Sequence, residues 1–573
     1  MRNRLLAGTF ALFAARQILS LIRTGPVLVA DEMGYLGNAR ALAGGIDSQM
    51  ELAPFYRGGY SLLLAPLVEA SSNPTTTYHL VLVLNAALAA SVFPLLYLLL
   101  TRFAAVRPAV AIWAALAGAV YPAVTVLSQA AMSENALFPL VCLWLIAFAG
   151  LLESSERRDQ LLWGAGLGAG TGALWAVHNR MIVAVVLAVV GLLWLAYRRR
   201  LGAAALALSL FVIALAFLGT HLLDGFIVDH NYGGSATDEF SSRMDELAGF
   251  GGLRTALANV LGQTWYLLVA TFGLAAATLL DFVGWSRRPS EAGAGAGGGR
   301  GLPVVGLLLA LTALLLLVSA AAFPERTRPD MLIYGRYTEV VAPALVAFGI
   351  VALARAPAWW SFASESGTKL NHTAARRAAW PLVGFVLLTG FVVLIRATAS
   401  DPDAANRWNI SALPFVTIQL GPGVLIGAAL VAAGGAWLLL RASALGTRAL
   451  GSVAVALFLA VVAYGAWNPV RSSERAVYPA GWTSPQSSAE AAEARRIAYD
   501  LDSYDTIGLY VFQWFLPNSR VSLFHGDREA PPARFVISNA GYGRQHPGSG
   551  AREIWSATGR DQVLWRLADR QAE

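Results

Sequence analysis

The chain has 573 residues, of which 56% are hydrophobic and only 13% are charged. A soluble domain usually carries about 25% charged residues, so this composition indicates a polytopic α-helical membrane protein. The basic residues behind the net charge of +7 are almost all arginines in short loops between apolar segments. Because no basic patch is interleaved with aromatic residues, nucleic acid is excluded as a partner. The single cysteine, Cys142, excludes a disulfide framework.

Apolar segments long enough to cross a membrane recur along the chain. A spanning helix needs about 20 mostly apolar residues, and about 13 segments meet that standard. They are 5–23, 79–100, 108–128, 134–152, 161–177, 181–197, 202–222, 262–284, 302–323, 338–356, 379–396, 420–440 and 447–467. The first is expected to stay as a helix rather than be cleaved as a signal peptide, because no clear cleavage site of small residues follows it.

The charges of the connecting loops predict the orientation of the chain. With the N-terminus inside, every loop assigned to the cytoplasm contains at least two basic residues, as in "ESSERRDQ" and "SRRPSEAGAGAGGGR". Cytoplasmic loops are enriched in Lys and Arg in this way. We therefore expect a multi-pass protein of the cytoplasmic membrane, with its N-terminus inside and its carboxylate-bearing loops outside.

Two parts of the chain are expected outside the membrane on this outer side. In the first outer loop, 24–78, "ADEMGYLGNARAL" and "APFYRGGYSLLLAPL" are predicted to be helices that lie in the membrane interface. An odd number of spans places the tail on the same side. In the tail, "YDTIGLYVFQWF", "SRVSLFHG" and "ARFVISNA" are predicted strands, and "SAEAAEARRIAYDL" is a predicted helix. The chain thus divides into a transmembrane domain, 1–467, and a small extracytoplasmic α/β domain, 468–573.

The adjacent carboxylates Asp31 and Glu32 are the first candidates for a reactive site. Asp31, Tyr35 and Asn38 fall on one face of the predicted interfacial helix. A carboxylate that is partly desolvated at a membrane boundary can act as a general base on a hydroxyl, or it can bind a divalent metal. The simpler explanation is that both acids stabilise the N-terminus of this helix, where carboxylates are favoured.

Several arginines also fall on the outer side, where positive charge runs against the topology rule. They are Arg40, Arg57, Arg180, Arg326, Arg328, Arg336 and Arg407. Arginine binds phosphate oxygens bidentately, so a group of them at the outer face would hold a lipid phosphate or pyrophosphate. Any one of them could instead pair with an acid such as Asp330 or Glu339, or with lipid headgroups.

Glu134, in "MSENALFP", is a further acid on the outer side. Ser133 could cap the helix that begins here, with Glu134 as an acid in its first turn. A role in catalysis is the alternative.

The segment "DEMGYLGNARAL", after one N-terminal span, resembles the first-loop signature of the GT-C glycosyltransferases. The resemblance is closest to the branch that holds the protein O-mannosyltransferases and the lipid A aminoarabinose transferase. These proteins also share a "P-x-Y…P-L" stretch, here "APFYRGGYSLLLAPL". The motifs lie in the first part of the chain. Over the rest, the resemblance rests on about 13 spans followed by an outer α/β domain.

The resemblance implies roles for individual residues. Asp31 matches the base that activates an acceptor hydroxyl, and Glu32 matches the second acid that supports it. Arg57 falls near the cation that relatives place against the donor phosphate, and Arg336 resembles part of an Arg-Tyr element. With Arg180, these arginines are the expected phosphate ligands. The expected supporting residues are Tyr35, Arg40, Tyr60, Glu134 and Tyr337.

The reaction that this resemblance implies is sugar transfer at the outer face of the membrane. The donor would be a polyprenyl-phosphate sugar, such as a mannosyl or arabinofuranosyl donor, and the acceptor a glycan, lipid or protein of the cell envelope, with membrane lipids as neighbours. No cofactor is firmly implied, and a divalent metal is left open. The alternatives are a flippase for a lipid-linked saccharide, for which internal repeats and midplane charges are scarce, and an oligosaccharide ligase.

Overall fold

The fold is given by a computed structural model. It describes residues 1–234, 249–286, 301–322, 328–365, 385–398, 407–413, 421–465, 467–503, 506–557 and 561–568. Arg326 and the side chain of Arg407, two of the arginines expected on the outer side, lie outside the described residues.

Most of the described chain is helical. The first half contains α1 (Arg2–Ser20), α2 (Val29–Leu42), α3 (Gly58–Glu69), α4 (Pro74–Leu98), η1 (Leu99–Phe103), α5 (Pro108–Ala119), α6 (Pro122–Leu127), α7 (Glu134–Glu153), α8 (Arg157–Val177), η2 (Asn179–Met181), α9 (Ile182–Tyr197) and α10 (Ala203–Asn231). There follow α12 (Phe250–Ala270), α13 (Leu274–Ser286), α14 (Leu302–Ala322), α15 (Pro329–Leu332), α16 (Arg336–Glu339), α17 (Ala342–Glu365), a helix at Phe385–Thr398, η5 (Arg407–Ile410), α19 (Pro422–Ala444), α20 (Thr447–Gly465) and α21 (Trp467–Val477). Several helices, α4, α5, α6 and α19 among them, begin with proline, whose missing N–H costs nothing at that position.

The helices confirm a multi-pass membrane protein. Among the described residues, seven helices are long and apolar enough to cross a membrane, and nine if each of two bent helix pairs forms one span. The expected spans over α5 and Phe385–Thr398 correspond to shorter apolar helices. The expected number of 13 is therefore not reached by length and composition in the described part of the chain.

The predicted span over residues 262–284 is not one continuous helix. The structure has two helices there, α12 and α13, which are bent by 101° relative to each other. The chain turns at Phe272 and Gly273, whose φ angles are 50° and 76°. This left-handed conformation ends a helix, and glycine adopts it at little cost. A run of apolar residues carries no sign of such a turn, which is why the sequence predicts one continuous helix here.

The first outer loop contains two helices, as predicted. These are α2 and α3, which pack against each other. Gly34 of α2 lies under the Tyr56 ring, so closely that a Cβ atom on Gly34 would lie 2.0 Å from the ring. Glycine therefore allows Tyr56 to lie directly on α2.

The tail contains a five-stranded sheet with the order β2-β1-β3-β5-β4. The elements are η6 (Pro485–Ser487), α22 (Ala489–Glu493), β1 (Arg496–Asp500), α23 (Thr506–Phe515), β2 (Arg520–Phe524), β3 (Phe535–Asn539), α24 (Tyr542–Gln545), η7 (Pro547–Ser549), β4 (Arg552–Ser556) and β5 (Gln562–Arg566). Strands β1, β2 and β3 are parallel, and β5 is antiparallel to β3 and β4. The predicted strands "SRVSLFHG" and "ARFVISNA" correspond to β2 and β3.

Two predictions for the tail are wrong. "RIAYD", placed in a helix, is strand β1, and "TIGLYVFQWF", predicted as a strand, is helix α23. The reason lies in the topology: β1 and β2 are parallel, and parallel neighbours need a crossover connection, which is usually a helix. The aromatic and β-branched residues of α23 favour a strand locally. Their burial between the sheet and the rest of the protein outweighs that preference.

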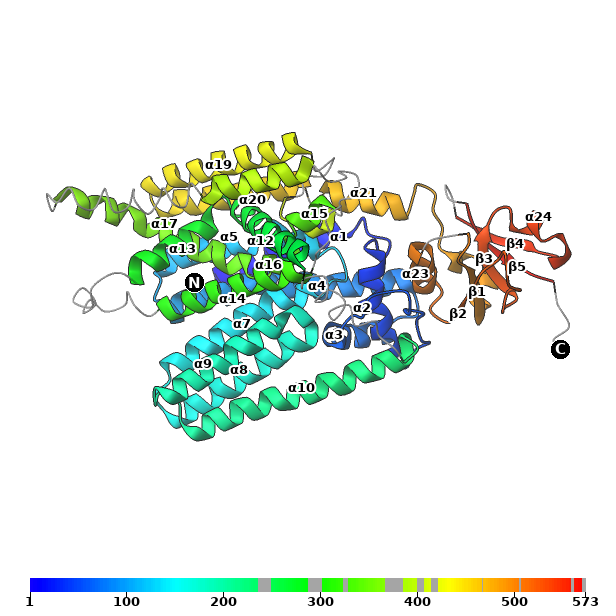
Figure 1. Cartoon of the computed structure of the whole chain (residues 1–573), viewed down its shortest axis with the longest axis horizontal. Helices are drawn as coiled ribbons and strands as arrows, with labels where there is room; N and C mark the ends of the chain where they lie inside the picture. Colours follow the sequence, from blue (N-terminus) through cyan, green and yellow to red (C-terminus); the bar gives the residue numbers. More distant parts are fainter. Residues whose placement is uncertain are drawn as a thin grey trace.

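The sheet of the tail lies beyond one end of the helical bundle (Figure 1). Helix α23 packs against α2, which brings the tail beside the first outer loop. The N-terminus of the chain lies away from the sheet, toward the opposite part of the bundle (Figure 1). The segment that carries Asp31 and the tail therefore lie at the same end of the molecule.

Candidate functional site

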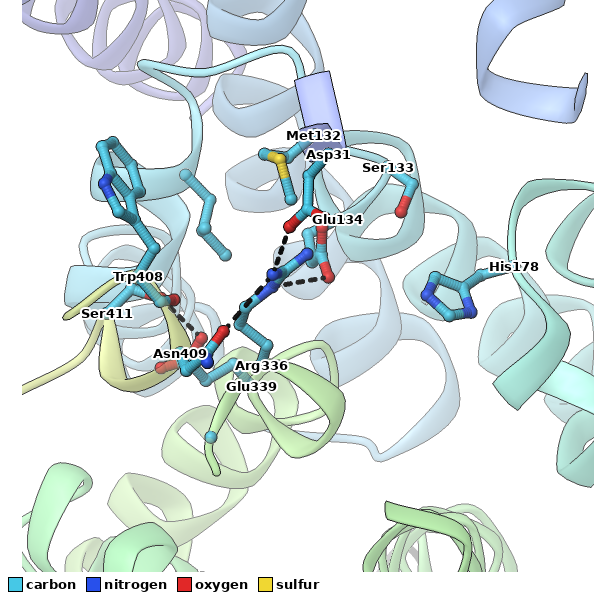
Figure 2. A network of polar contacts seen from close by, with 12 residues as sticks. Asp31, Met132, Ser133, Glu134, His178, Arg336, Glu339, Trp408, Asn409 and Ser411 are labelled. Carbon is cyan, nitrogen blue, oxygen red and sulfur yellow. Dashed lines mark hydrogen bonds and ion pairs between the residues drawn. The ribbon is translucent and has the colours of Figure 1, made fainter. Parts of the chain in front are cut away.

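Four charged side chains form one network between α2, α7, α16 and η2. Arg336 Nη1 lies 2.8 Å from Asp31 Oδ2, and Arg336 Nε lies 3.5 Å from Glu134 Oε1. The same Glu134 oxygen lies 3.0 Å from Arg180 Nη2. Figure 2 shows the Arg336 side chain reaching from its helix toward both carboxylates. The structure thus brings together four expected site residues, although Asp31 and Arg336 are 305 positions apart.

The network is buried at one end and accessible at the other. The side chains of Glu134 and Arg180 are fully buried, whereas the Asp31 side chain is 28% exposed. A buried charge is costly unless it is paired, and Glu134 is paired with two arginines. Asp31 is therefore the carboxylate of this network that an incoming molecule can reach.

Asp31 has a second partner in the first outer loop. The Tyr56 hydroxyl donates a hydrogen bond to Asp31 Oδ1 at 2.7 Å. Burial raises the pKa of Tyr56 well above its usual value, and the nearby carboxylate adds to this effect. Tyr56 therefore stays protonated and remains a donor. Each oxygen of Asp31 still has lone-pair capacity for a further donor, such as a substrate hydroxyl.

Arg180 has two buried donors that are left unpaired within the described part of the chain. Its Nη2 faces Glu134, but no hydrogen-bond partner among the described residues reaches Nε or Nη1. Its guanidinium carbon lies 4.5 Å from the centre of the Tyr337 ring. A buried donor left unpaired costs about 1–3 kcal/mol. The arrangement therefore favours an anion beside Arg180.

His178 adjoins Arg180 without adding charge. Its Nδ1 accepts a hydrogen bond from the Arg180 backbone N–H at 3.3 Å. Burial lowers the pKa of His178 well below its usual value, and the Arg180 guanidinium lowers it further. The imidazole is therefore neutral near pH 7, and the net charge here is set by the arginines and carboxylates.

Glu32 has partners of its own and is fully buried. Its Oε1 accepts hydrogen bonds from the backbone N–H groups of Val27 and Leu28, at 2.8 and 2.9 Å. Its Oε2 accepts from the Tyr78 hydroxyl at 2.6 Å and from the Ala131 N–H at 2.7 Å. These bonds fasten the N-terminus of α2, as the simpler explanation supposes for this acid. The other acid of the pair makes no capping bond.

Two of the expected supporting tyrosines lie in the packing around α2. The Tyr35 hydroxyl donates to Ser133 Oγ at 2.9 Å, and the Tyr60 hydroxyl donates to Asn85 Oδ1 at 2.6 Å. The Tyr35 ring contacts the rings of both Tyr56 and Tyr60 edge-on. Ser133 precedes α7 but makes no capping bond of its own. These tyrosines position the segments on either side of the charged network.

The remaining arginines have separate partners. Arg40 donates to the backbone oxygen of Gln513 at 2.8 Å, so it binds the tail rather than the network. Arg57 lies 3.4 Å from Asp224 and stacks on Trp175, with its guanidinium carbon 3.7 Å from the ring centre. Arg57 is nevertheless close enough to His178 to help lower the pKa of that imidazole. It therefore lies near the Arg180 end of the network.

Arg328 follows the simpler explanation for the outer arginines. Its Nη2 lies 2.8 Å from Asp330 Oδ2, so it forms an ion pair with an acid two positions along the chain. Arg328 is therefore not among the four charged side chains of the network.

The loop 408–413 contributes contacts that the sequence did not predict. Asn409 accepts a hydrogen bond from Arg336 Nη1 at 3.4 Å and donates to Asp330 Oδ2 at 2.7 Å. Its backbone oxygen also accepts from the Gly335 N–H at 2.8 Å. Asn409 thus orients the arginine that contacts Asp31. The polar run "NRWN" in an outer loop is the only signal that could have pointed to it.

Glu339, considered above only as a possible partner for an arginine, holds this loop instead. Its Oε2 accepts a hydrogen bond from the Ser411 hydroxyl at 2.8 Å, and its Oε1 accepts from the Ala412 N–H at 2.9 Å (Figure 2). The Tyr266 hydroxyl also donates to Oε1. Glu339 therefore holds the loop 408–413 in place through hydrogen bonds, as Glu32 holds the N-terminus of α2.

Gly34→Ala is expected to disturb the site through packing alone. The added methyl group would overlap the Tyr56 ring and push it from its place over α2. Overpacking of this kind costs about 1–3 kcal/mol, so the thermal unfolding midpoint should fall. Gly219→Ala in α10 is the control, because a Cβ atom there meets nothing within 4 Å. Equal midpoints for the two variants would contradict the packing described here.

Within the described part of the chain, no three His, Cys, Asp or Glu side chains come together as a metal ion would require. The two network carboxylates are each paired with an arginine.

The chain matches no protein-family model and no curated protein. Among solved structures it is similar to ArnT from Cupriavidus metallidurans bound to undecaprenyl phosphate, with a TM-score of 0.55 and 13% identity over 99% of each chain. The apo state of that ArnT aligns with a TM-score of 0.49 and 13% identity, over 98% of this chain and 97% of that one. The first comparison shows a shared fold along the whole chain. It confirms the expected fold class, a GT-C-like helical membrane protein with a small C-terminal α/β domain.

Proposed function

We propose that this protein is a membrane glycosyltransferase of the GT-C type that uses a polyprenyl-phosphate sugar as its donor. The observation that carries the proposal is the Arg180 guanidinium. Two of its buried nitrogens have no partner among the described residues, and three successive ion pairs link it to the accessible Asp31. Such a pair of groups suits a reaction in which a phosphate leaves and a hydroxyl attacks. The shared fold with an ArnT bound to undecaprenyl phosphate supports the same conclusion.

The phosphate of the donor would bind at the Arg180 end of the network. The charges of the two arginines in the network are balanced by its two carboxylates. A bound phosphate therefore needs N–H groups that do not already contact a carboxylate. Nε and Nη1 of Arg180 meet that requirement. Arg57, whose Nε is also unpartnered among the described residues, is the second proposed ligand. Charge-assisted bonds from arginine would stabilise the phosphate as it leaves.

Asp31 is the proposed general base. Its carboxylate would accept the proton of an acceptor hydroxyl while the hydroxyl oxygen bonds to the anomeric carbon of the sugar. The bond from that carbon to the phosphate oxygen breaks in the same step, and polyprenyl phosphate departs with its electron pair. Arg336 and Tyr56 hold Asp31 in place through one hydrogen bond each. The acceptor is proposed to be a glycan, lipid or protein of the cell envelope.

The proposed location of this reaction is the outer face of the cytoplasmic membrane. The basic residues of the loops expected inside support a cytoplasmic N-terminus. The sheet domain and Asp31 lie at the same end of the molecule, away from the N-terminus. The tail would then lie outside, beside the acceptor.

Mass spectrometry of lipids that purify with the protein tests the donor. We expect a polyprenyl phosphate, or its glycosylated form, at up to one molecule per chain. After reconstitution in vesicles, the protein should transfer the sugar of that lipid to an acceptor. Movement of the lipid across the bilayer without any transfer would contradict the proposal and favour the flippase alternative.

A further inference from the structure

Helix α21 connects the transmembrane helices to the tail and contacts two segments that hold the candidate site. One is the segment before α2, the helix that carries Asp31, and the other is the loop 408–413, which carries Asn409. The neighbouring residues Glu474 and Ser473 of α21 make the two contacts, to Arg23 and to Trp408. The short helix is therefore placed where it can set how the two segments lie relative to each other.

Glu474 leads to α2 through a series of buried bonds. Its Oε2 lies 2.7 Å from Arg23 Nη1, and its Oε1 accepts from the Thr24 N–H at 2.6 Å. Arg23 Nη2 donates to the Tyr78 hydroxyl at 3.0 Å, and that hydroxyl donates to Glu32 at 2.6 Å. Arg23 is fully buried and Glu474 nearly so. The bonds end at the N-terminus of α2, one residue from Asp31.

Ser473 contacts the loop 408–413. The Trp408 Nε1–H donates to Ser473 Oγ at 3.2 Å. Trp408 precedes Asn409, whose side chain bonds to Arg336. A shift of α21 would therefore move the segments on both sides of the Asp31–Arg336 pair.

The tail is fastened to the same region. Gln513 of α23 exchanges two hydrogen bonds with the backbone of Gln49, at 2.6 and 3.1 Å. The Tyr478 hydroxyl, just after α21, donates to the Pro26 oxygen at 2.7 Å. The tail thus contacts the first outer loop on both sides of α2.

We infer that α21 is a positioning element. Glu474 and Ser473 fix the position of Asp31 relative to Arg336, and α21 connects both residues to the tail. Its effect on catalysis rests on the proposed function. Neither residue touches the network directly, so both act through the segments that they fasten. An acceptor bound by the tail would, through this connection, act on the geometry around Asp31.

Hydrogen exchange of the full-length protein in detergent, followed by mass spectrometry, tests the mechanical part of the inference. Glu474→Gln should speed exchange in peptides that cover 24–32, where Thr24, Val27 and Leu28 use carboxylates of this series. Ser473→Ala should speed exchange over 407–413 instead. Arg475→Gln, an exposed charge on the same helix, is the matched control and should change neither.

Turnover tests the positioning role. Misplacing a reacting group by about 1 Å can cost on the order of 10²-fold, so Glu474→Gln should lower kcat by about tenfold or more, with little change in KM for the donor. Unchanged exchange over 24–32 in Glu474→Gln would overturn the inference. So would a kcat equal to that of Arg475→Gln, since α21 would then be structural only. If the wild type transfers no sugar, the proposed function fails, and the exchange pattern still decides whether α21 holds both segments.

Discussion

Asp31→Asn is expected to remove sugar transfer while leaving the fold and donor binding in place. Asparagine keeps the size of the side chain: its carbonyl oxygen can still accept a hydrogen bond from Arg336, and its amide N–H can donate to the Tyr56 hydroxyl. It cannot take a proton from an acceptor hydroxyl. General-base catalysis is typically worth about 10²–10⁴-fold, and we expect kcat to fall by that factor. Transfer from a radiolabelled polyprenyl-phosphate sugar in vesicles measures the effect.

Glu69→Gln is the matched control for this variant. Glu69 is also a carboxylate of the first outer loop, but it is exposed at the end of α3. Its replacement should leave turnover near the wild-type value. If Asp31→Asn retains the turnover of Glu69→Gln, Asp31 is not the general base of the reaction.

Arg180→Gln should have the largest effect on stability. It removes one of two cations from Glu134, which is fully buried. Breaking a buried ion pair by removing one partner costs about 3–5 kcal/mol, and the remaining contact with Arg336 places this case at the lower end. The thermal unfolding midpoint in detergent should fall, and the polyprenyl phosphate that purifies with the protein should be lost.

The double variant Arg180→Gln/Glu134→Gln separates these two effects. With both charges removed, position 134 no longer holds a buried carboxylate that has lost a cation. The thermal unfolding midpoint should therefore recover in part. Lipid binding should not recover, because Nε and Nη1 of Arg180 are the proposed phosphate donors. A double variant that retains the lipid would show that Arg180 serves only to neutralise Glu134.

The charged residues of the candidate site could be predicted from the sequence because charges in the loops expected outside are conspicuous in an apolar chain. Asp31, Glu134, Arg180 and Arg336 all stand out in this way, and the structure places them in one network. The pairing itself could not be predicted, because position along a chain says nothing about which of several outer acids meets a given arginine. Arg328 and Arg336 illustrate the difference. One pairs with an acid two residues away, the other with an acid 305 positions away.

Neutral and backbone groups were harder to predict. Asn409 has no charge and no motif, yet it bonds to Arg336. Glu32 shares a motif with Asp31, but its role follows from two backbone N–H groups that only the folded turn brings within reach. In the tail, local preference pointed to a strand for α23, and the parallel pairing of β1 and β2 required a helix. The errors thus fall where contacts distant in sequence decide the outcome.

The contacts between α2 and the tail also fix an order of events during synthesis. Arg40 and its partner Gln513 are 473 positions apart, and Arg23 and Glu474 are 451 apart. Chains are made at about 5–20 residues per second, so the first outer loop waits roughly 20–100 s for these partners. During that time Arg23 lacks Glu474, and Arg40 lacks Gln513. The segment around Asp31 is among the first to be made and among the last to form all its contacts. A nascent chain released before its tail is made would therefore lack the contacts of this segment with Glu474 and Gln513.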